Sequence, residues 1–177
     1  ESVIRQILPE NGDTLFTPLR AQALEAMNRF PEATKEWNSL LDKDSTRVDV
    51  LMELAKCYKT TNRYHQAMLC YRKAAGLFPE NKFFRQQYIR SLLAAEEYPE
   101  VCDECLQWIG NDSTSATAYQ LLGMAYEGLG TEYPDSLDDA YWAYQEAYSR
   151  DSLDRQTVAR LAAMLNDFQQ YDDAVEV

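Results

Sequence analysis

Apolar residues recur along this chain at the spacing of amphipathic helices. From Val48 onward they follow an i, i+3, i+4, i+7 pattern as far as Tyr58, and a second run of the same kind extends from Tyr64 to Ala74. A polar break at residues 60–62 separates the two runs. Because this spacing puts the apolar side chains on one face of a helix, the stretch predicts a helix, a turn and a second helix.

The same pattern repeats with a period of 34 residues, and of 39 residues at the last step. The units start near Thr14, Val48, Lys82, Ala116 and Arg155 and reach Val177. Their eighth place holds Ala21, Ala55, Ile89, Gly123 and Ala162. Their second helices start at Phe30, Tyr64, Tyr98, Leu137 and Tyr171, followed three residues later by Ala33, Ala67, Val101, Ala140 and Ala174. Small residues let two helices cross closely, so we expect helices paired within each unit.

Further along the second helix, each of the first four units carries two more apolar places in phase. The first of these places holds Trp37, Tyr71, Cys105 and Tyr144, and the second holds Leu40, Ala74, Trp108 and Ala147. Chance does not produce so many registers in phase, so the repeat organises the chain.

This pattern resembles the tetratricopeptide repeat (TPR) family, whose 34-residue unit is a helix-turn-helix. The resemblance covers residues 14–177 and implies an all-α fold, a right-handed superhelical α-solenoid of about five stacked antiparallel helix pairs, the last one incomplete. Residues 1–13 are expected as an N-terminal helical stub or cap, or as the remnant of an earlier unit. Unit four carries five extra residues within 130–136, and of the prolines that close a unit in the family only Pro79 remains.

The charge of the chain argues against two classes of partner. Its 177 residues include 17 Lys or Arg and 29 Asp or Glu, which gives a net charge of −12. Such a chain repels nucleic acid and anionic lipid, and no stretch approaches the roughly 18 apolar residues that span a bilayer. We therefore expect no nucleic acid and no membrane insertion. The sequence opens on Glu1 without a methionine, which favours an exported bacterial protein, periplasmic or secreted, over a cytoplasmic one.

The resemblance implies a binding groove lined by the first helix of each unit. The family places groove side chains at defined positions of that helix, and here we expect partner contacts from Met52, Lys56, Lys59, Phe83, Gln86, Arg90, Leu93, Gln120 and Met124. Cations beside apolar residues suit an extended or helical peptide that has apolar anchors and some acidic groups. The alternative is that these residues are ordinary solvated faces of amphipathic helices.

A set of basic and amide residues that some family members use to grip the C-terminal carboxylate of chaperone tails is not found. Counted from unit two, the corresponding places hold Met52, Lys56, Gln87, Thr117 and Leu121. The resemblance therefore disfavours a role as a chaperone adaptor.

The sharpest candidate for chemistry is the pair Cys102 and Cys105, because cysteines three apart can ligate zinc or cycle as a dithiol. A closed zinc site needs four ligands, and Cys105 occupies a core place inside a predicted helix. We therefore interpret the pair as small apolar packing residues. His65 is the only histidine, and no phosphate loop or nucleophile motif appears. We expect no catalytic residue, no metal and no cofactor.

The sequence thus favours a non-catalytic protein-protein interaction module that holds a protein or peptide in the groove. The alternative is a structural or oligomerisation scaffold within a longer TPR protein, with no peptide ligand. The last unit stops about one turn into its second helix, so we expect that the natural chain continues or that the uncovered end self-associates.

Overall fold

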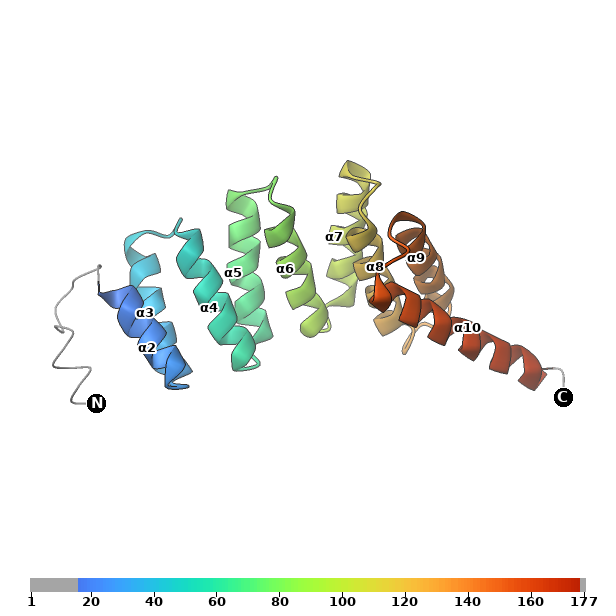
Figure 1. Cartoon of the computed structure of the whole chain (residues 1–177), viewed down its shortest axis with the longest axis horizontal. Coiled ribbons are helices and arrows are strands. Elements are labelled where there is room, and N and C mark those ends of the chain that lie inside the picture. The colour runs from blue at the N-terminus through green and yellow to red at the C-terminus, as the bar shows by residue number, and fades with distance from the viewer. Residues whose placement is uncertain (1–15, 176–177) are drawn as a thin grey trace. The chain divides into compact units, whose positions relative to one another are not determined.

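The computed structural model of the chain describes the backbone of residues 16–175 and the side chains of residues 16–167. These residues form nine α-helices and no strand (Figure 1). The helices are α2 (Thr17–Ala26), α3 (Phe30–Lys43), α4 (Val48–Thr60), α5 (Tyr64–Leu77), α6 (Lys82–Ala94), α7 (Tyr98–Asn111), α8 (Ala116–Leu129), α9 (Ser136–Arg150) and α10 (Arg155–Val175). The expected N-terminal stub, 1–13, lies outside the described residues. None of the described helices is long and apolar enough to cross a membrane.

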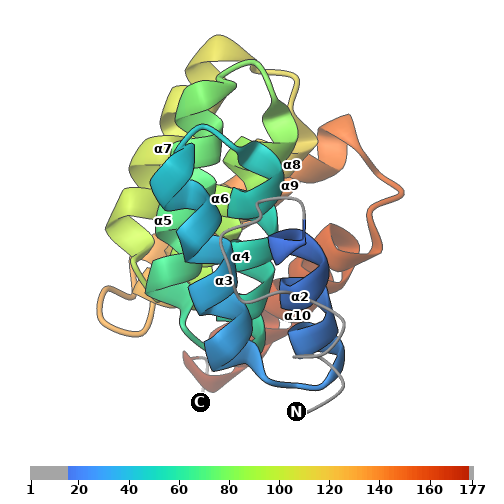
Figure 2. The ribbon, with the colours of Figure 1, turned by 90° about the vertical axis from the view of Figure 1, so that its left-hand side faces the viewer.

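The described residues form two compact parts that divide within α6, residues 16–91 and 92–175, which are called the first unit and the second unit, whereas the repeat units are numbered. In the first unit α2 packs on α3, α3 on α4 and α4 on α5, and Figure 2 shows α2 and α3 side by side. In the second unit α7 packs on α8, α8 on α9 and α9 on α10. These contacts confirm the prediction of an all-α fold made of antiparallel helix pairs.

The turns inside the helix pairs follow the 34-residue period. Asn28, Asn62 and Glu96 have φ values of 58°, 58° and 62°, a left-handed conformation that asparagine tolerates better than most residues. The next residue in each turn donates its N–H back to the end of the preceding helix. These bonds run from Arg29 to Leu24 (2.8 Å), from Arg63 to Tyr58 (2.8 Å) and from Glu97 to Leu92 (3.1 Å). Such a bond satisfies a helix-end carbonyl, so one turn geometry serves three units.

The core of the first unit is built from the positions that the repeat register marks. Ala21 and Ala55, at the eighth place, are fully buried, and Trp37 and Tyr71 fill the space between the paired helices. Phe84 and Tyr88 of α6 pack against the same cluster. The register therefore predicted these core positions, whereas Val50 and Cys57, which are also fully buried, stand at places that it did not mark.

A close approach between α8 and α9 explains the glycine in unit four. A Cβ atom on Gly123 would lie 2.8 Å from the ring of Tyr144. Tyr144 is fully buried and donates its hydroxyl to Glu127, 2.9 Å away. The eighth place must be a glycine here because the Tyr144 ring occupies the space that a methyl group would need.

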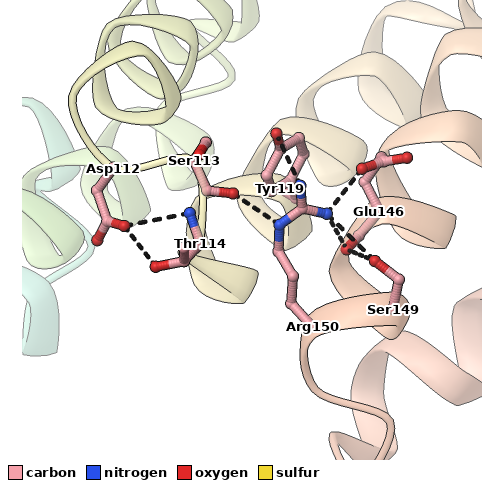
Figure 3. Close-up of polar contacts among 7 residues, drawn as sticks. All are labelled: Asp112, Ser113, Thr114, Tyr119, Glu146, Ser149 and Arg150. Atoms are coloured by element: carbon pink, nitrogen blue, oxygen red, sulfur yellow. Dashed lines mark hydrogen bonds and ion pairs between the residues drawn. The ribbon is translucent and has the colours of Figure 1, made fainter.

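Arg150, in the last turn of α9, links the end of α9 to the start of α8 (Figure 3). Its Nε donates to the carbonyl of Ser113 at 2.7 Å, and its Nη1 lies 2.7 Å from a carboxylate oxygen of Glu146. The guanidinium also stacks 4.0 Å from the centre of the Tyr119 ring. Arg150 thereby joins the loop before α8 to the last turn of α9.

The fifth unit departs from the expectation. The sequence places the start of a second helix at Tyr171, but α10 is one helix from Arg155 to Val175. No glycine or proline lies between Leu165 and Tyr171 to end it. Ala162 is exposed, whereas Ala21 and Ala55 at the equivalent place are buried. The side chains of Tyr171 and Ala174 lie outside the described residues.

Candidate functional site

Three of the expected contact residues lie along α4 in the first unit. Met52, Lys56 and Lys59 are spaced i, i+4, i+7 and so share one face of the helix. Met52 is half-buried against the core, and both lysines are exposed. Within the described part of the chain Lys59 makes no ion pair.

Lys56 is held by two carboxylates. Its Nζ lies 3.3 Å from Glu25 of α2 and 3.2 Å from Glu53 of its own helix, and these neighbours raise its pKa, Glu53 most strongly. Glu25 also accepts the indole N–H of Trp37 at 2.7 Å. Lys56 therefore joins α2 to α4, and two acids already balance its charge.

Three more expected residues share a face of α6. Phe83, Gln86 and Arg90 are spaced i, i+3, i+7, and Phe83 is 49% exposed. The ring of Phe83 meets Phe84 edge-on at 5.7 Å between centroids. Arg90 is half-buried, and its guanidinium has no hydrogen bond or ion pair among the residues that the structure describes.

The remaining expected residues belong to the second unit, and two of them serve its own packing. Gln120 is buried and donates to Asp154 at 2.5 Å and to Thr157 at 3.2 Å. Met124 is half-buried, packs against the Tyr144 cluster and accepts a long contact from Gln156 at 3.9 Å. Both residues join α8 to α10. Leu93, near the end of α6, is half-buried.

Positive charge is strongly segregated along the chain, which the repeat places do not reveal. From Leu54 to Ala95 the chain has eight Lys or Arg residues and a single acid, Glu80, although the whole chain has 17 basic and 29 acidic residues. Besides Lys56, Lys59 and Arg90, the segment has Arg63, Arg72, Lys73, Lys82 and Arg85. We call these eight residues the basic segment. A count of charge along the chain would have found it.

A pocket beside Phe83 was also missed. Residues 77–83, from the last residue of α5 to the second residue of α6, line an open surface pocket of about 620 Å³. Phe78 is 50% exposed there, and its ring centroid lies 6.1 Å from that of Phe84. We call the cavity lined by Leu77, Phe78, Pro79 and Phe83, together with residues 80–82, the aromatic pocket.

The four cysteines are buried and unpaired. Burial raises the pKa of Cys57 to about 12 and that of Cys102 to about 11, and it also raises the pKa of Cys105. At neutral pH such thiols are protonated, and a thiol rather than a thiolate is a poor nucleophile and metal ligand. Among the described side chains, no group of three or more His, Cys, Asp or Glu is placed to hold a metal ion.

Comparisons with known proteins agree with this architecture. Residues 48–81 match the model of the tetratricopeptide repeat family. The chain is 24% identical over 180 residues to a barley (Hordeum vulgare) protein named probable UDP-N-acetylglucosamine-peptide N-acetylglucosaminyltransferase SPINDLY. The match covers 97% of this chain, which spans only 18% of that relative.

Solved structures show the same fold. MamA from Desulfovibrio magneticus RS-1 superposes with a TM-score of 0.67 at 19% identity, over 93% of this chain and 91% of that one. The second TPR domain of human RPAP3, in complex with the HSP70 peptide SGPTIEEVD, gives a TM-score of 0.53 at 19% identity, over 64% and 91% of the two chains. The helix pairs, their 34-residue register and these matches define an all-α repeat protein. Residues 48–81 match the tetratricopeptide repeat family, and the fold of the described residues is that of solved TPR structures, as the sequence predicted.

Proposed function

We propose that this chain is a protein-protein interaction module that binds an acidic peptide, extended or helical, on the faces of α4 and α6. The observation that carries the proposal is that the side chains of Lys59, Phe83 and Arg90 are not engaged by other polar groups of the chain. These side chains stand on first helices of their units, where the family binds its partners, and none of the three has a polar or ionic partner in the described structure. Half-exposed Met52 and Gln86 lie on the same two faces.

The charge of the region supports an acidic partner. The basic segment concentrates positive charge on a chain whose net charge is −12, so an acidic peptide would be attracted there and repelled elsewhere. The RPAP3 domain offers a parallel, because the peptide in its complex ends in the acidic sequence EEVD. This chain lacks the clamp residues at the places that the family uses, so we expect a peptide without that terminal motif.

The proposal includes no catalysis by this stretch of chain. Its thiols are buried and protonated at neutral pH, and its single histidine, His65, is exposed at the start of α5. The scaffold role, with an empty groove and with self-association through the end of α10, is the alternative.

A selection from a random peptide library, displayed on phage and captured on the immobilised chain, tests the proposal. We expect enrichment of peptides rich in Asp and Glu. By fluorescence anisotropy, a synthetic enriched peptide should bind the double variant Lys59→Glu, Arg90→Glu at least about ten-fold more weakly, which corresponds to about 1.4 kcal/mol.

The matched control is Lys35→Glu, which reverses one exposed charge on the second helix α3 and should change the affinity less than about two-fold. The proposal fails if the wild-type chain enriches no acidic peptide, or if Lys35→Glu weakens binding as much as the double variant does. Self-association of the same sample in light scattering would then favour the scaffold role.

A further inference from the structure

Phe78 occupies a repeat position that three other units give to a turn-forming aspartate. The equivalent residues are Asp44, Asp112 and Asp151. Their φ values are −145°, −146° and −142°, and that of Phe78 is −133°, so the backbone is nearly the same. Each aspartate accepts a backbone N–H two residues later, at 2.9 Å from Thr46, 3.2 Å from Thr114 and 3.1 Å from Leu153. The fold therefore prefers an aspartate at this place and does not require the phenylalanine.

Phe83 is a second aromatic residue at a polar position. Its counterparts at the second place of the other described units are Asp49, Thr117 and Gln156. Phe83 leaves half of its surface exposed, so the core gains little from it. Two half-exposed aromatic rings thus replace polar residues, one directly after α5 and the other at the start of α6, and both leave apolar surface open to a ligand.

Two of the polar side chains that line the aromatic pocket have partners inside the chain. The side-chain oxygen of Asn81 accepts the N–H of Phe83 at 3.1 Å, and Lys82 also has an interaction partner. What the pocket offers to a ligand is the apolar surface of Leu77, Phe78, Pro79 and Phe83. Its volume of about 620 Å³ lies in the range of sites that bind small ligands, which is ample for a bulky side chain and its neighbour.

The surrounding charge identifies the kind of molecule that carries this side chain. Lys73 lies one turn before Leu77, Lys82 lines the pocket itself, and Arg85 follows one turn later. Glu80 is the single acid of this stretch. An anionic chain is therefore drawn to the pocket, and a neutral or basic one is not.

We propose that the aromatic pocket is the anchor site of the peptide partner, and that it binds one bulky apolar side chain, aromatic or large aliphatic, flanked by Asp or Glu. This inference rests on the proposed function, because the acidic peptide is the same one. It adds a specificity element, since the basic segment attracts the peptide and the pocket sets its register by burying an anchor.

The test repeats the phage selection with the double variant Phe78→Asn, Phe83→Thr. Asparagine can accept the same turn hydrogen bond as aspartate without adding charge, and threonine is the residue of unit four at this place, so the variant keeps the fold. We expect the wild-type chain to enrich peptides in which Trp, Phe, Tyr or Leu stands beside Asp or Glu. The variant should still enrich acidic peptides but lose the preference for the bulky residue.

The matched control is Leu106→Asn, which removes an equally exposed apolar side chain from α7 of the second unit and should leave both preferences intact. For one enriched peptide, replacement of its bulky residue by Ala should weaken binding to the wild type about ten-fold and to the variant less than two-fold. If the variant keeps the bulky-residue preference, or if acidic peptides enrich without it, the pocket proposal is wrong and the proposed function stands. If no acidic peptide enriches on the wild type, both fail.

Discussion

The loop and helices around α5 and α6 differ from the α8–α10 region in how they use polar and charged groups. In the second unit Arg150 and Arg160 are paired with Glu146 and Glu127, at 2.7 Å in each case, and Gln120 is satisfied by α10. In the first unit Lys59 and Arg90 have no such partner in the described structure, and two phenylalanines stand exposed. Polar and charged side chains thus serve packing in one region and are left available in the other.

This difference shows why the repeat place alone does not identify a binding residue. Gln120 and Gln86 stand at the fifth place of successive units, yet Gln120 is buried in a hydrogen-bonded contact with α10 and Gln86 is half-exposed. Whether such a residue is available to a partner depends on whether neighbouring helices already supply its hydrogen bonds. Substitutions can test this contrast, and the largest loss of stability is expected at the residue that contributes most to folding.

The largest effect is expected from Tyr144→Ala. The ring is fully buried between α8 and α9, and its removal leaves a cavity beside Gly123, so the free energy of unfolding should fall by about 3–5 kcal/mol. Urea unfolding followed by circular dichroism measures it. Phe83→Ala, in the exposed region, should change stability by less than about 0.5 kcal/mol; equal losses in the two variants would abolish the contrast.

A smaller loss of stability is expected from Arg150→Ala. The change removes the bonds to the Ser113 carbonyl and to Glu146, as well as the stacking on Tyr119, at a cost of about 1–2 kcal/mol. The thermal midpoint is the measurement, compared with that of Lys59→Ala, which should stay near the wild-type value because Lys59 has no such contacts. A midpoint unchanged by Arg150→Ala would show that the contact in Figure 3 contributes nothing.

The smallest expected effect is on the pH dependence of stability, and it comes from Asp154. Hydrogen bonds from the hydroxyl and the N–H of Thr157 lower the pKa of this carboxyl below its ordinary value, with a smaller contribution from Gln120. A pKa lowered by folding stabilises the protein above the unfolded value of about 3.9 and loses that contribution as the pH falls through the folded value. Asp154→Asn should therefore be less stable than the wild type at pH 7, and the difference should shrink below pH 4. A difference that stays constant from pH 7 to pH 3 would contradict this role.

Much of the fold could be predicted from the sequence because residues of similar size recur at fixed places of the repeat. Ala21 and Ala55 could be assigned to helix crossings, and Ala33 and Ala67 to the space between paired helices, and all four are fully buried. The second helix expected from Tyr171 was wrong at the level of the backbone, because α10 continues without a break. Periodicity marks the faces of helices, but here it did not mark where a helix ends.

The candidate site was predictable only in part. Lys59, Phe83 and Arg90 were identified from the family's groove places, and the structure leaves their side chains without a polar or ionic partner among the described residues. Phe78 was not identified, although a comparison of the loops that follow each unit would have shown a phenylalanine in place of three aspartates. Lys56 looked available for a ligand in the sequence, and its two carboxylate partners could not be foreseen because Glu25 is 31 residues away.

By itself the sequence determined the all-α class, the 34-residue register, the buried positions and the acidic net charge, because each depends on local periodicity or simple composition. Only the tertiary structure decided which charges and amides are already satisfied. That outcome depends on contacts between separate helices, such as Gln120 with Thr157 and Lys56 with Glu25. A hydrogen bond or ion pair needs two atoms within a few ångströms, and no spacing along a single helix specifies that distance.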